Sequence, residues 1–170
     1  MTNMSREPWG GISMAYVDMS SDVNYGKKIL IFVEGTILKP KSILLQYNYK
    51  SYVPIGKAVS LVDRWYTQGA SIVFCTHQRD LHKVNETAAM LEEFGFKGER
   101  LYYRGDKQEY KDLVEMIRPD ILIEDDCYSI GGAKEMCIAN VSPYMKERIR
   151  SIVMKEFKGI DSLSSNYLEL

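Results

Sequence analysis

The side chains best suited to chemistry in this sequence are polar or acidic residues that directly follow short apolar runs. Glu34 follows ILIFV, Thr76 follows IVFC, and Asp125 and Asp126 follow ILIE. In an open α/β sheet the carboxyl ends of parallel strands meet at one edge, and ligands bind there. Adjacent carboxylates repel each other unless a cation such as Mg²⁺ compensates. The pattern predicts a cation site at this edge, with a solvated acidic turn as the alternative.

The segment ILIFVEGTIL, residues 29–38, is the most informative stretch. It resembles the first motif of the haloacid dehalogenase (HAD) superfamily, which reads apolar run, Asp, any residue, Asp or Glu, Gly, Thr. Glu34, Gly35 and Thr36 fit the second half of this motif. The leading aspartate, the family's nucleophile, is absent. Taken alone, the segment would equally suit a core strand followed by a turn.

Two alignments account for the missing aspartate. Either Phe32 replaces it, or an aspartate between Phe32 and Val33 has been lost. We prefer the loss, because the family often has Phe just before the nucleophile and a small apolar residue just after it. Losing one residue turns the upstream side chains to the other face of the sheet, which a strand that is apolar on both faces could tolerate.

The resemblance also implies a set of phosphate-binding residues. Thr76 matches the second motif, whose hydroxyl and a nearby backbone N–H hold a phosphate oxygen, and His77 and Gly35 are expected beside it. Lys107 stands about where the third motif has the lysine that neutralises nucleophile and phosphate. Lys111, one helical turn later, is the alternative, and either lysine could be an ordinary surface residue.

Asp125 and Asp126 match the metal carboxylates of the fourth motif. The resemblance implies that they bind Mg²⁺ together with the backbone carbonyl of Glu34. In the family mechanism the first aspartate attacks phosphorus, while the second acid, here Glu34, protonates the leaving group and then activates water. Loss of a nucleophile costs ~10⁴–10⁶-fold in rate. We therefore expect a phosphomonoesterase that is impaired as written, or else a non-catalytic phospholigand-binding pseudo-enzyme.

The ligand expected from the resemblance is a small phosphorylated metabolite or a nucleotide. Tyr47, Tyr49 and Tyr52 follow the first motif, where family members insert specificity elements. These tyrosines could stack on a base or a sugar, or they could pack on the domain. His77 likewise could face the site or only cap a turn.

The elements that must position these residues alternate between strands and helices. This alternation predicts an α/β fold, a three-layer, Rossmann-like parallel sheet with helices on both faces and the first strand at its centre. The expected strands are 29–33, 71–75, 100–103 and 121–124. Helices are expected at 55–68, around 81–94, from a capping box of Asp106 and Glu109 to a stop at Pro119, and from Ser142 through Val153.

The chain divides into an N-terminal extension and one domain. Residues 1–26 lack clear periodicity, so we expect an extension outside the core and partly disordered, although Trp9, Tyr16 and Val17 could dock onto the domain. Residues 27–170 form the expected HAD-like domain. The connection 38–54 is long for a structureless loop and is expected to hold a short helix or hairpin as a specificity insert.

Composition limits the remaining possibilities. The chain has 170 residues, 45% of them hydrophobic, and a formal net charge of −1. A charge near zero favours neither nucleic acid nor an anionic membrane, and no apolar run approaches the ~20 residues that span a bilayer. Three cysteines without a CxxC pair indicate free thiols in a reducing cytoplasm, and two histidines argue against a His-rich zinc site. The sequence does not address the oligomeric state.

Overall fold

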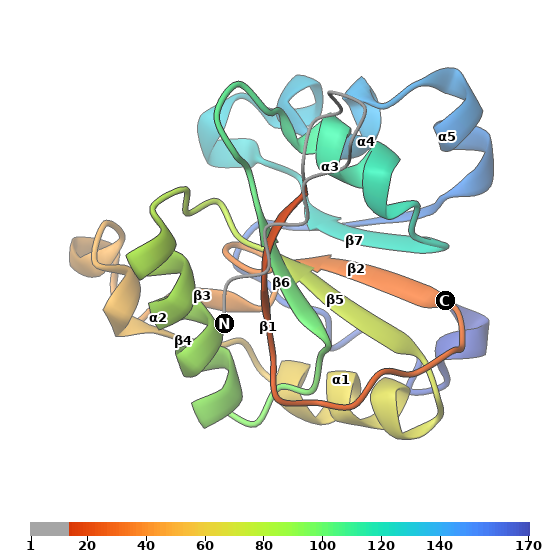
Figure 1. Ribbon diagram of the computed structural model, residues 1–170. Coiled ribbons are helices and arrows are strands. Elements are labelled where there is room, and N and C mark those ends of the chain that lie inside the picture. Colours follow the sequence, from red (N-terminus) through yellow and green to blue (C-terminus); the bar gives the residue numbers. More distant parts are fainter. Residues whose placement is uncertain (1–13) are drawn as a thin grey trace.

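The computed structural model describes residues 14–170. Its main sheet has six strands in the order β1-β6-β5-β2-β7-β8, with β2 at the centre between β5 and β7 (Figure 1). All neighbours in this sheet are parallel except β1, which is antiparallel to β6. The strands are β1 (Ala15–Asp18), β2 (Lys28–Phe32), β5 (Ser71–Cys75), β6 (Arg100–Tyr103), β7 (Ile121–Asp125) and β8 (Arg150–Met154).

Helices cover both faces of this sheet, which confirms the expected three-layer α/β architecture. The helices α1 (Ala58–Thr67) and α2 (Leu81–Glu93) pack on one face, and α3 (Tyr110–Ile117), α4 (Cys137–Asn140) and α5 (Pro143–Arg148) pack on the other. Side chains alternate between faces along a strand, so a central strand covered on both sides must be apolar at each of its buried positions.

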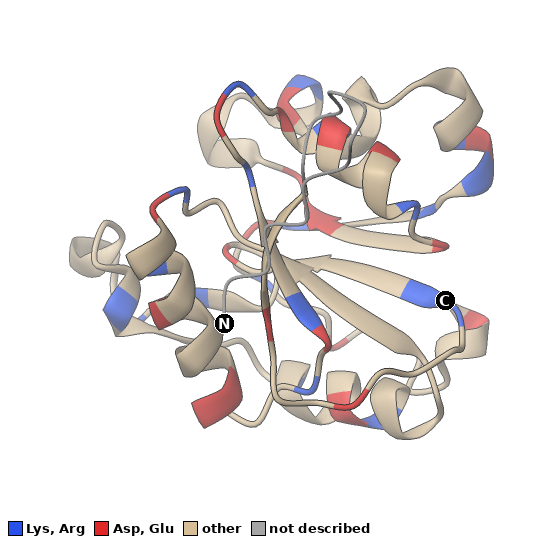
Figure 2. Cartoon of the chain, viewed as in Figure 1, with Lys and Arg blue, Asp and Glu red and all other residues tan. Residues whose placement is uncertain are grey.

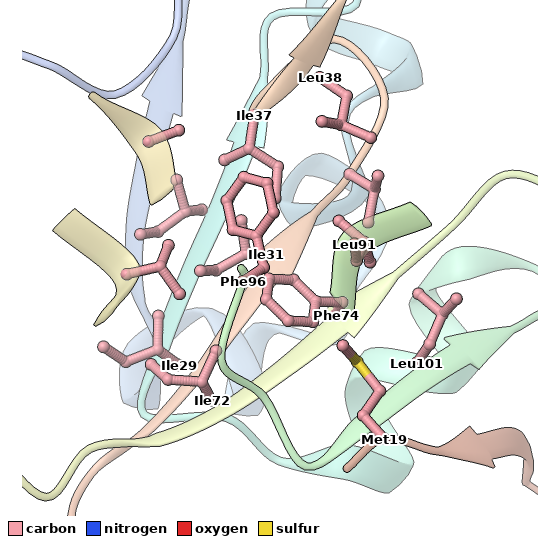
Figure 3. Packing of buried hydrophobic residues seen from close by; sticks show 14 of the residues in the cluster. Met19, Ile29, Ile31, Ile37, Leu38, Ile72, Phe74, Leu91, Phe96 and Leu101 are labelled. Atoms are coloured by element: carbon pink, nitrogen blue, oxygen red, sulfur yellow. The ribbon is translucent and has the colours of Figure 1, made fainter. Parts of the chain in front are cut away.

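The central strand β2 shows this rule at work. Ile29 and Ile31 belong to the core under α1 and α2, while Leu30 belongs to the core under α3, and all three are fully buried. Figure 3 shows Ile31 beside Phe74 of β5 and Phe96, whose ring lies edge-on to Phe74. Each such side chain contributes roughly 1.5–3 kcal/mol by leaving water, so these strands hold the sheet's carboxyl edge in a fixed position.

The expected insert between β2 and α1 is a small hairpin. The strands β3 (Leu38–Pro40) and β4 (Tyr52–Pro54) pair antiparallel, and two short 3₁₀ turns, η1 (Ile43–Leu45) and η2 (Tyr49–Ser51), fill the connection. Lys50 of the insert lies 2.7 Å from Glu86 of α2, which ties the hairpin to the domain. The prediction of a local helix or hairpin at 38–54 is confirmed.

The expectation for the N-terminal segment is corrected for the residues that the structure describes. Ala15–Asp18 form the edge strand β1, and Val17 and Met19 are buried in the core. Tyr16 packs on Tyr102, so the docking left open for Tyr16 and Val17 is confirmed. Four residues are too few to show the alternation of apolar and polar side chains that predicts a strand. This segment becomes a strand because it pairs with the edge of β6. The expectation for residues 1–13, including Trp9, lies outside the described residues.

Two expected helix features also differ. The last helix ends at Arg148, and Ile152 and Val153 belong to β8 instead, which pairs with β7. The apolar residues Met145, Ile149, Ile152 and Val153 stand at helical spacing and so predict a helix. The run from Ile149 to Met154 is also rich in β-branched residues, which suit a strand equally well. The capping box of α3 is formed by Glu109 and Asp112 and not by Asp106. The backbone N–H of Glu109 donates to Asp112 at 2.8 Å.

Three more 3₁₀ turns complete the chain: η3 (Tyr128–Ile130), η4 (Gly132–Glu135) and η5 (Tyr167–Glu169). The indole N–H of Trp65 in α1 donates to the Ser164 carbonyl at 2.9 Å and fastens the C-terminal segment beneath α1. No helix within residues 14–170 is long and apolar enough to cross a membrane. In Figure 2 the acidic and the basic residues are interspersed along the ribbon of the chain.

Candidate functional site

A cavity of about 870 Å³ lies at the carboxyl edge of the main sheet. Every parallel strand of that sheet sends a side chain to its wall from the strand's end or from the residues just beyond it. These side chains are Phe32 and Glu34 after β2, His77 after β5, Arg104 after β6, Asp125 at the end of β7 and Glu156 after β8. This is where open α/β sheets bind ligands.

The Glu34 carboxylate is held by the residues that follow β5. Thr76 donates its hydroxyl to Oε1 at 2.5 Å, and the backbone N–H of His77 donates to Oε2 at 3.1 Å. The His77 ring Nδ1 lies 3.2 Å from the same Oε2. Burial raises the pKa of Glu34, but the hydrogen bond and charge of His77 and the Thr76 hydroxyl outweigh burial and leave the pKa below its usual value. The structure therefore brings Glu34, Thr76 and His77 together.

Asp125 and Asp126 form a second group of acids, together with Glu156. Oxygen atoms of these three side chains lie within 4.8 Å of one another. Burial and the neighbouring acid Glu156 raise the pKa of Asp125 to about 6, against a hydrogen bond from the Cys127 N–H. Three clustered carboxylates are the donor set that a hard divalent cation takes, and such a cation offsets their repulsion. The group therefore fits Mg²⁺.

Gly35 brings the two groups together. Its φ of +86° is a conformation that glycine adopts without strain. A Cβ built at Gly35 would lie 3.1 Å from the Asp125 carboxyl. Only glycine lets the chain after β2 pass this close to the end of β7, so Gly35 sits between the acids and does not itself present a donor side chain.

Glu124, the first of the three consecutive acids, has a structural role and is not part of the acid cluster. It is buried, and its carboxylate accepts the backbone N–H groups of Cys137 at 2.6 Å and Ile138 at 2.9 Å. It therefore anchors the start of α4 to the end of β7. Burial raises its pKa to about 7, although these two hydrogen bonds act in the opposite direction.

The two candidate lysines of the third motif lie apart from each other. Lys107 is exposed in the turn before α3, with a φ of +62°, and does not line the cavity. Lys111 lines the cavity and pairs with Glu109 at 2.9 Å. The alternative lysine is thus the one at the cavity.

Sequence reasoning missed two residues of this site, Arg104 and Glu156. The Arg104 guanidinium lies 3.9 Å from the centre of the Tyr110 ring, and its Nε is buried without a hydrogen-bond partner in the described part of the chain. Arg104 follows a strand, so the rule that identified Thr76 could have found it. Glu156 follows β8, and it was missed because that strand was read as a helix.

Phe32 lies at the end of β2 on the cavity wall. Its ring packs edge-on against Tyr110, with the ring centres 5.1 Å apart. An aromatic ring offers neither a nucleophilic oxygen nor a metal ligand. The cavity wall at this point is therefore apolar.

The insert supplies an aromatic wall. Tyr47, Tyr49 and Tyr52 all line the cavity, and Tyr47 is 81% exposed. The rings of Tyr49 and His77 lie edge to face, with their centres 4.4 Å apart. Ile130, from the turn after β7, lines the cavity and is 69% exposed. Two segments far apart in sequence thus present apolar side chains to the same opening.

Comparisons with known proteins add little to this geometry. No protein-family model and no curated protein matches the sequence. Among solved structures, the chain is similar to a D,D-heptose 1,7-bisphosphate phosphatase from Burkholderia thailandensis, with 13% identity, a TM-score of 0.43, and coverage of 78% of this chain and 94% of that chain. The corresponding phosphatase from B. bronchiseptica, complexed with magnesium and phosphate, gives 12% identity, a TM-score of 0.43 and the same coverage.

The Pnkp1/Rnl/Hen1 RNA repair complex is a third similar structure, with 10% identity, a TM-score of 0.48, and coverage of 88% of this chain and 48% of that chain. At these identities and scores the similarity says nothing about the ligand or the activity of this chain.

Proposed function

We propose that this chain is a HAD-like phosphohydrolase scaffold that binds Mg²⁺ and a small phosphorylated ligand, with hydrolysis impaired as the sequence stands. The observation that carries the proposal is the cavity at the sheet's carboxyl edge, where Asp125, Asp126 and Glu156 gather within 4.8 Å. Cationic side chains of Arg104 and Lys111 line the same cavity. Carboxylates for a metal and cations for an anion are the two parts that a phosphoryl site needs.

Mg²⁺ would be held by the carboxylates of Asp125, Asp126 and Glu156, with the Glu34 carbonyl as a further ligand by resemblance to the family. When bound, it would neutralise charge on a phosphoryl group. The chain's own residues bind and orient the ligand: Arg104 and Lys111 supply positive charge at the wall. The HAD resemblance of residues 27–134 and the order of the four motifs support this assignment.

Impaired hydrolysis follows from two features. Phe32 lines the cavity where the resemblance requires the nucleophilic aspartate. The Glu34 carboxylate, the family's acid and base, is engaged by Thr76 and His77. The position of Phe32 on the cavity wall favours the replacement alignment over the loss of a residue that the sequence alone suggested. A ligand-binding protein without turnover is the second candidate, and Phe32 is the observation that favours it.

The aromatic wall bears on the ligand. Tyr47 and Tyr49 of the insert and Ile130 of the turn after β7 all line the cavity, so a phosphorylated compound that also carries a flat or apolar group, such as a nucleotide, fits this site. Exposed aromatic rings bind bases by stacking. The free thiols of Cys75, Cys127 and Cys137 support a reducing, cytoplasmic location as part of the same proposal.

Metal binding gives the first test. We expect Mg²⁺ to bind at millimolar concentration by calorimetry, because one carboxylate ligand of the family is missing, and Asp125→Asn to abolish the binding. Lys107→Gln is the control, since Lys107 lies outside the cavity lining. Tight binding that survives Asp125→Asn would mean that the metal site lies elsewhere.

Turnover gives the second test. The chain as written should hydrolyse p-nitrophenyl phosphate with Mg²⁺ at near-background rates, and turnover at ~1 s⁻¹ or more would contradict the proposal. Phe32→Asp should restore activity if Phe32 replaces the nucleophile, whereas insertion of Asp between Phe32 and Val33 should restore it if a residue was lost. If both variants fold and neither gains activity, the non-catalytic binding protein becomes the better description.

A further inference from the structure

Glu34 occupies a set of hydrogen-bond donors that have the arrangement of an anion site. Its two carboxylate oxygens accept the Thr76 hydroxyl at 2.5 Å and the His77 backbone N–H at 3.1 Å, and the His77 ring Nδ1 lies 3.2 Å away. All three donors come from the two residues that follow β5. They therefore hold a fixed geometry relative to the sheet, whether or not Glu34 is present.

The Thr76 hydroxyl is oriented for this purpose. The backbone N–H of Gln78 donates to its oxygen at 3.2 Å, which leaves the hydroxyl proton free to point at Glu34. Thr76 is fully buried. The Thr76 hydroxyl is buried and the His77 N–H is partly buried, so leaving these donors without an acceptor costs free energy, and an oxygen with negative charge satisfies them best.

We propose that Glu34 is an intramolecular competitor, whose carboxylate fills an oxyanion subsite made by Thr76 and His77 and leaves it only in exchange for an oxyanion of the ligand. The inference rests on the proposed phospholigand-binding function and adds a constraint to it. Carboxylate and phosphate present the same chemistry, oxygens that carry negative charge and accept charge-assisted hydrogen bonds. Either can satisfy the donors of Thr76 and His77, but not both at once.

The structure gives Glu34 room to leave. Its side chain is 13% exposed and lines the 870 Å³ cavity, so rotation about the side-chain torsions carries the carboxylate into open space. The backbone before it stays in place, because Val33 donates its N–H to the Cys75 carbonyl at 2.9 Å. Exchange thus needs a rotamer change and no rearrangement of the sheet.

When Glu34 fills the subsite, an oxyanion can bind only to the molecules in which the subsite is vacant. The apparent affinity is therefore the intrinsic affinity multiplied by the vacant fraction. Two charge-assisted hydrogen bonds hold Glu34, which makes that fraction small. Removing the carboxylate should therefore tighten oxyanion binding by roughly tenfold or more.

The test uses inorganic phosphate and the full chain in metal-free buffer with a chelator at constant ionic strength. Calorimetry gives the affinity, and the ¹H–¹⁵N shift of the His77 amide reports whether phosphate reaches this subsite. We expect Glu34→Ala to bind phosphate roughly tenfold or more tighter than the unmodified chain, with the His77 amide shifting on titration. Glu34→Gln keeps the size and loses the charge, so it should show a smaller gain in the same direction.

Glu135→Gln is the matched control, because it removes a negative charge from the same cavity without vacating the subsite. It should change phosphate affinity less than about twofold, since exposed charges are well screened. Adding Thr76→Val to Glu34→Ala should cancel the gain. The same titrations with acetate and with sulfate show which oxyanions bind to the subsite.

The inference fails if neither Glu34 variant gains affinity, if Glu135→Gln gains as much, or if the gain survives Thr76→Val. Should Glu34→Ala not fold, Glu34→Gln carries the same comparison. Neither metal nor turnover enters the measurement. A chain that never hydrolyses a phosphomonoester can still confirm the inference, and a chain that binds Mg²⁺ through Asp125 can still refute it.

Discussion

Arg104 has no predicted role in the sequence analysis, but the structure places it at the candidate site. It lines the cavity, stacks on Tyr110 at 3.9 Å and keeps a buried Nε without a partner among the described residues, whereas Lys107 is exposed and outside the cavity lining. An arginine fork held against an aromatic ring is preorganised for a phosphate or carboxylate. Arg104 is therefore better placed than Lys107 to bind an anion in the cavity.

Replacing each cation separately tests this assignment. Arg104→Gln should weaken binding of inorganic phosphate by roughly tenfold to a hundredfold at low salt, because it removes a charge-assisted contact worth roughly 1.5–3 kcal/mol. Lys107→Gln should change the affinity less than about twofold. Calorimetry gives the phosphate affinity of both variants in parallel. An equal loss of affinity in both would mean that phosphate is attracted by the overall electrostatic potential of the protein and not by a contact with Arg104.

Residues of the site can be predicted from the sequence where they stand at the end of a strand or just beyond it. Glu34, Thr76 and Asp125 all stand at such positions. The partner that holds the Glu34 carboxylate was not foreseeable, because hydrogen bonding between Glu34 and Thr76 depends on side-chain direction and not on spacing. Glu156 was lost with its strand, since a site residue cannot be placed when its element is assigned wrongly.

Among the elements, β1 contributes more than its four residues suggest. It covers the edge of β6, and Val17 within it and Met19 just after it are each 7% exposed. A chain that begins at residue 27, the boundary that the sequence suggested, leaves this edge unpaired. Unpaired edges recruit other chains.

Truncation measures this contribution. A chain of residues 27–170 should lose at least about 3 kcal/mol of unfolding free energy relative to residues 14–170, because burying Val17 and Met19 is worth roughly 1.5–3 kcal/mol each. Urea unfolding gives the difference, and light scattering should detect association of the shorter chain. Equal urea midpoints and two monodisperse samples would show that β1 is dispensable.

The elements themselves were mostly readable from the sequence. The expected strands at 71–75 and 100–103 match β5 and β6 residue for residue, because apolar runs bounded by Gly, Thr or charged residues leave few alternatives. β8 could not be predicted, because the spacing of its apolar residues suits a helix as well as a strand. Its pairing with β7 makes it a strand. Tertiary contact overrides local pattern in such short segments.

For the molecule as a whole, buried acids set the pH dependence of stability. The pKa of Glu124 is raised to about 7 and that of Asp125 to about 6, mainly by burial. Between the ordinary pKa of an acid and these raised values, the folded chain holds protons that the unfolded chain has released. The free energy of unfolding must therefore fall as pH rises through this window. Glu34 has a lowered pKa, so its contribution is lost only under more acidic conditions, below the window.

We expect metal-free protein to lose on the order of 1–3 kcal/mol of stability between about pH 5 and pH 7.5. Thermal unfolding in a chelating buffer across that range provides the measurement. Glu124→Gln removes one of the two titrating acids and should make the profile less steep, with the contribution of Asp125 remaining. A stability that rises with pH in the unmodified chain would contradict the assignment of raised pKa values to these acids.

The strand order also governs how a newly made chain reaches its fold. β2 is nearly all apolar, and its two neighbours are β5 and β7, the second of which ends only at Asp125. At the ~5–20 residues per second of synthesis, β2 waits several seconds on the ribosome with one edge open. During that time it can pair with other nascent chains. Soluble yield should therefore depend on chaperone supply during translation, and expression with and without a co-produced holdase, compared at equal synthesis rates, measures that dependence.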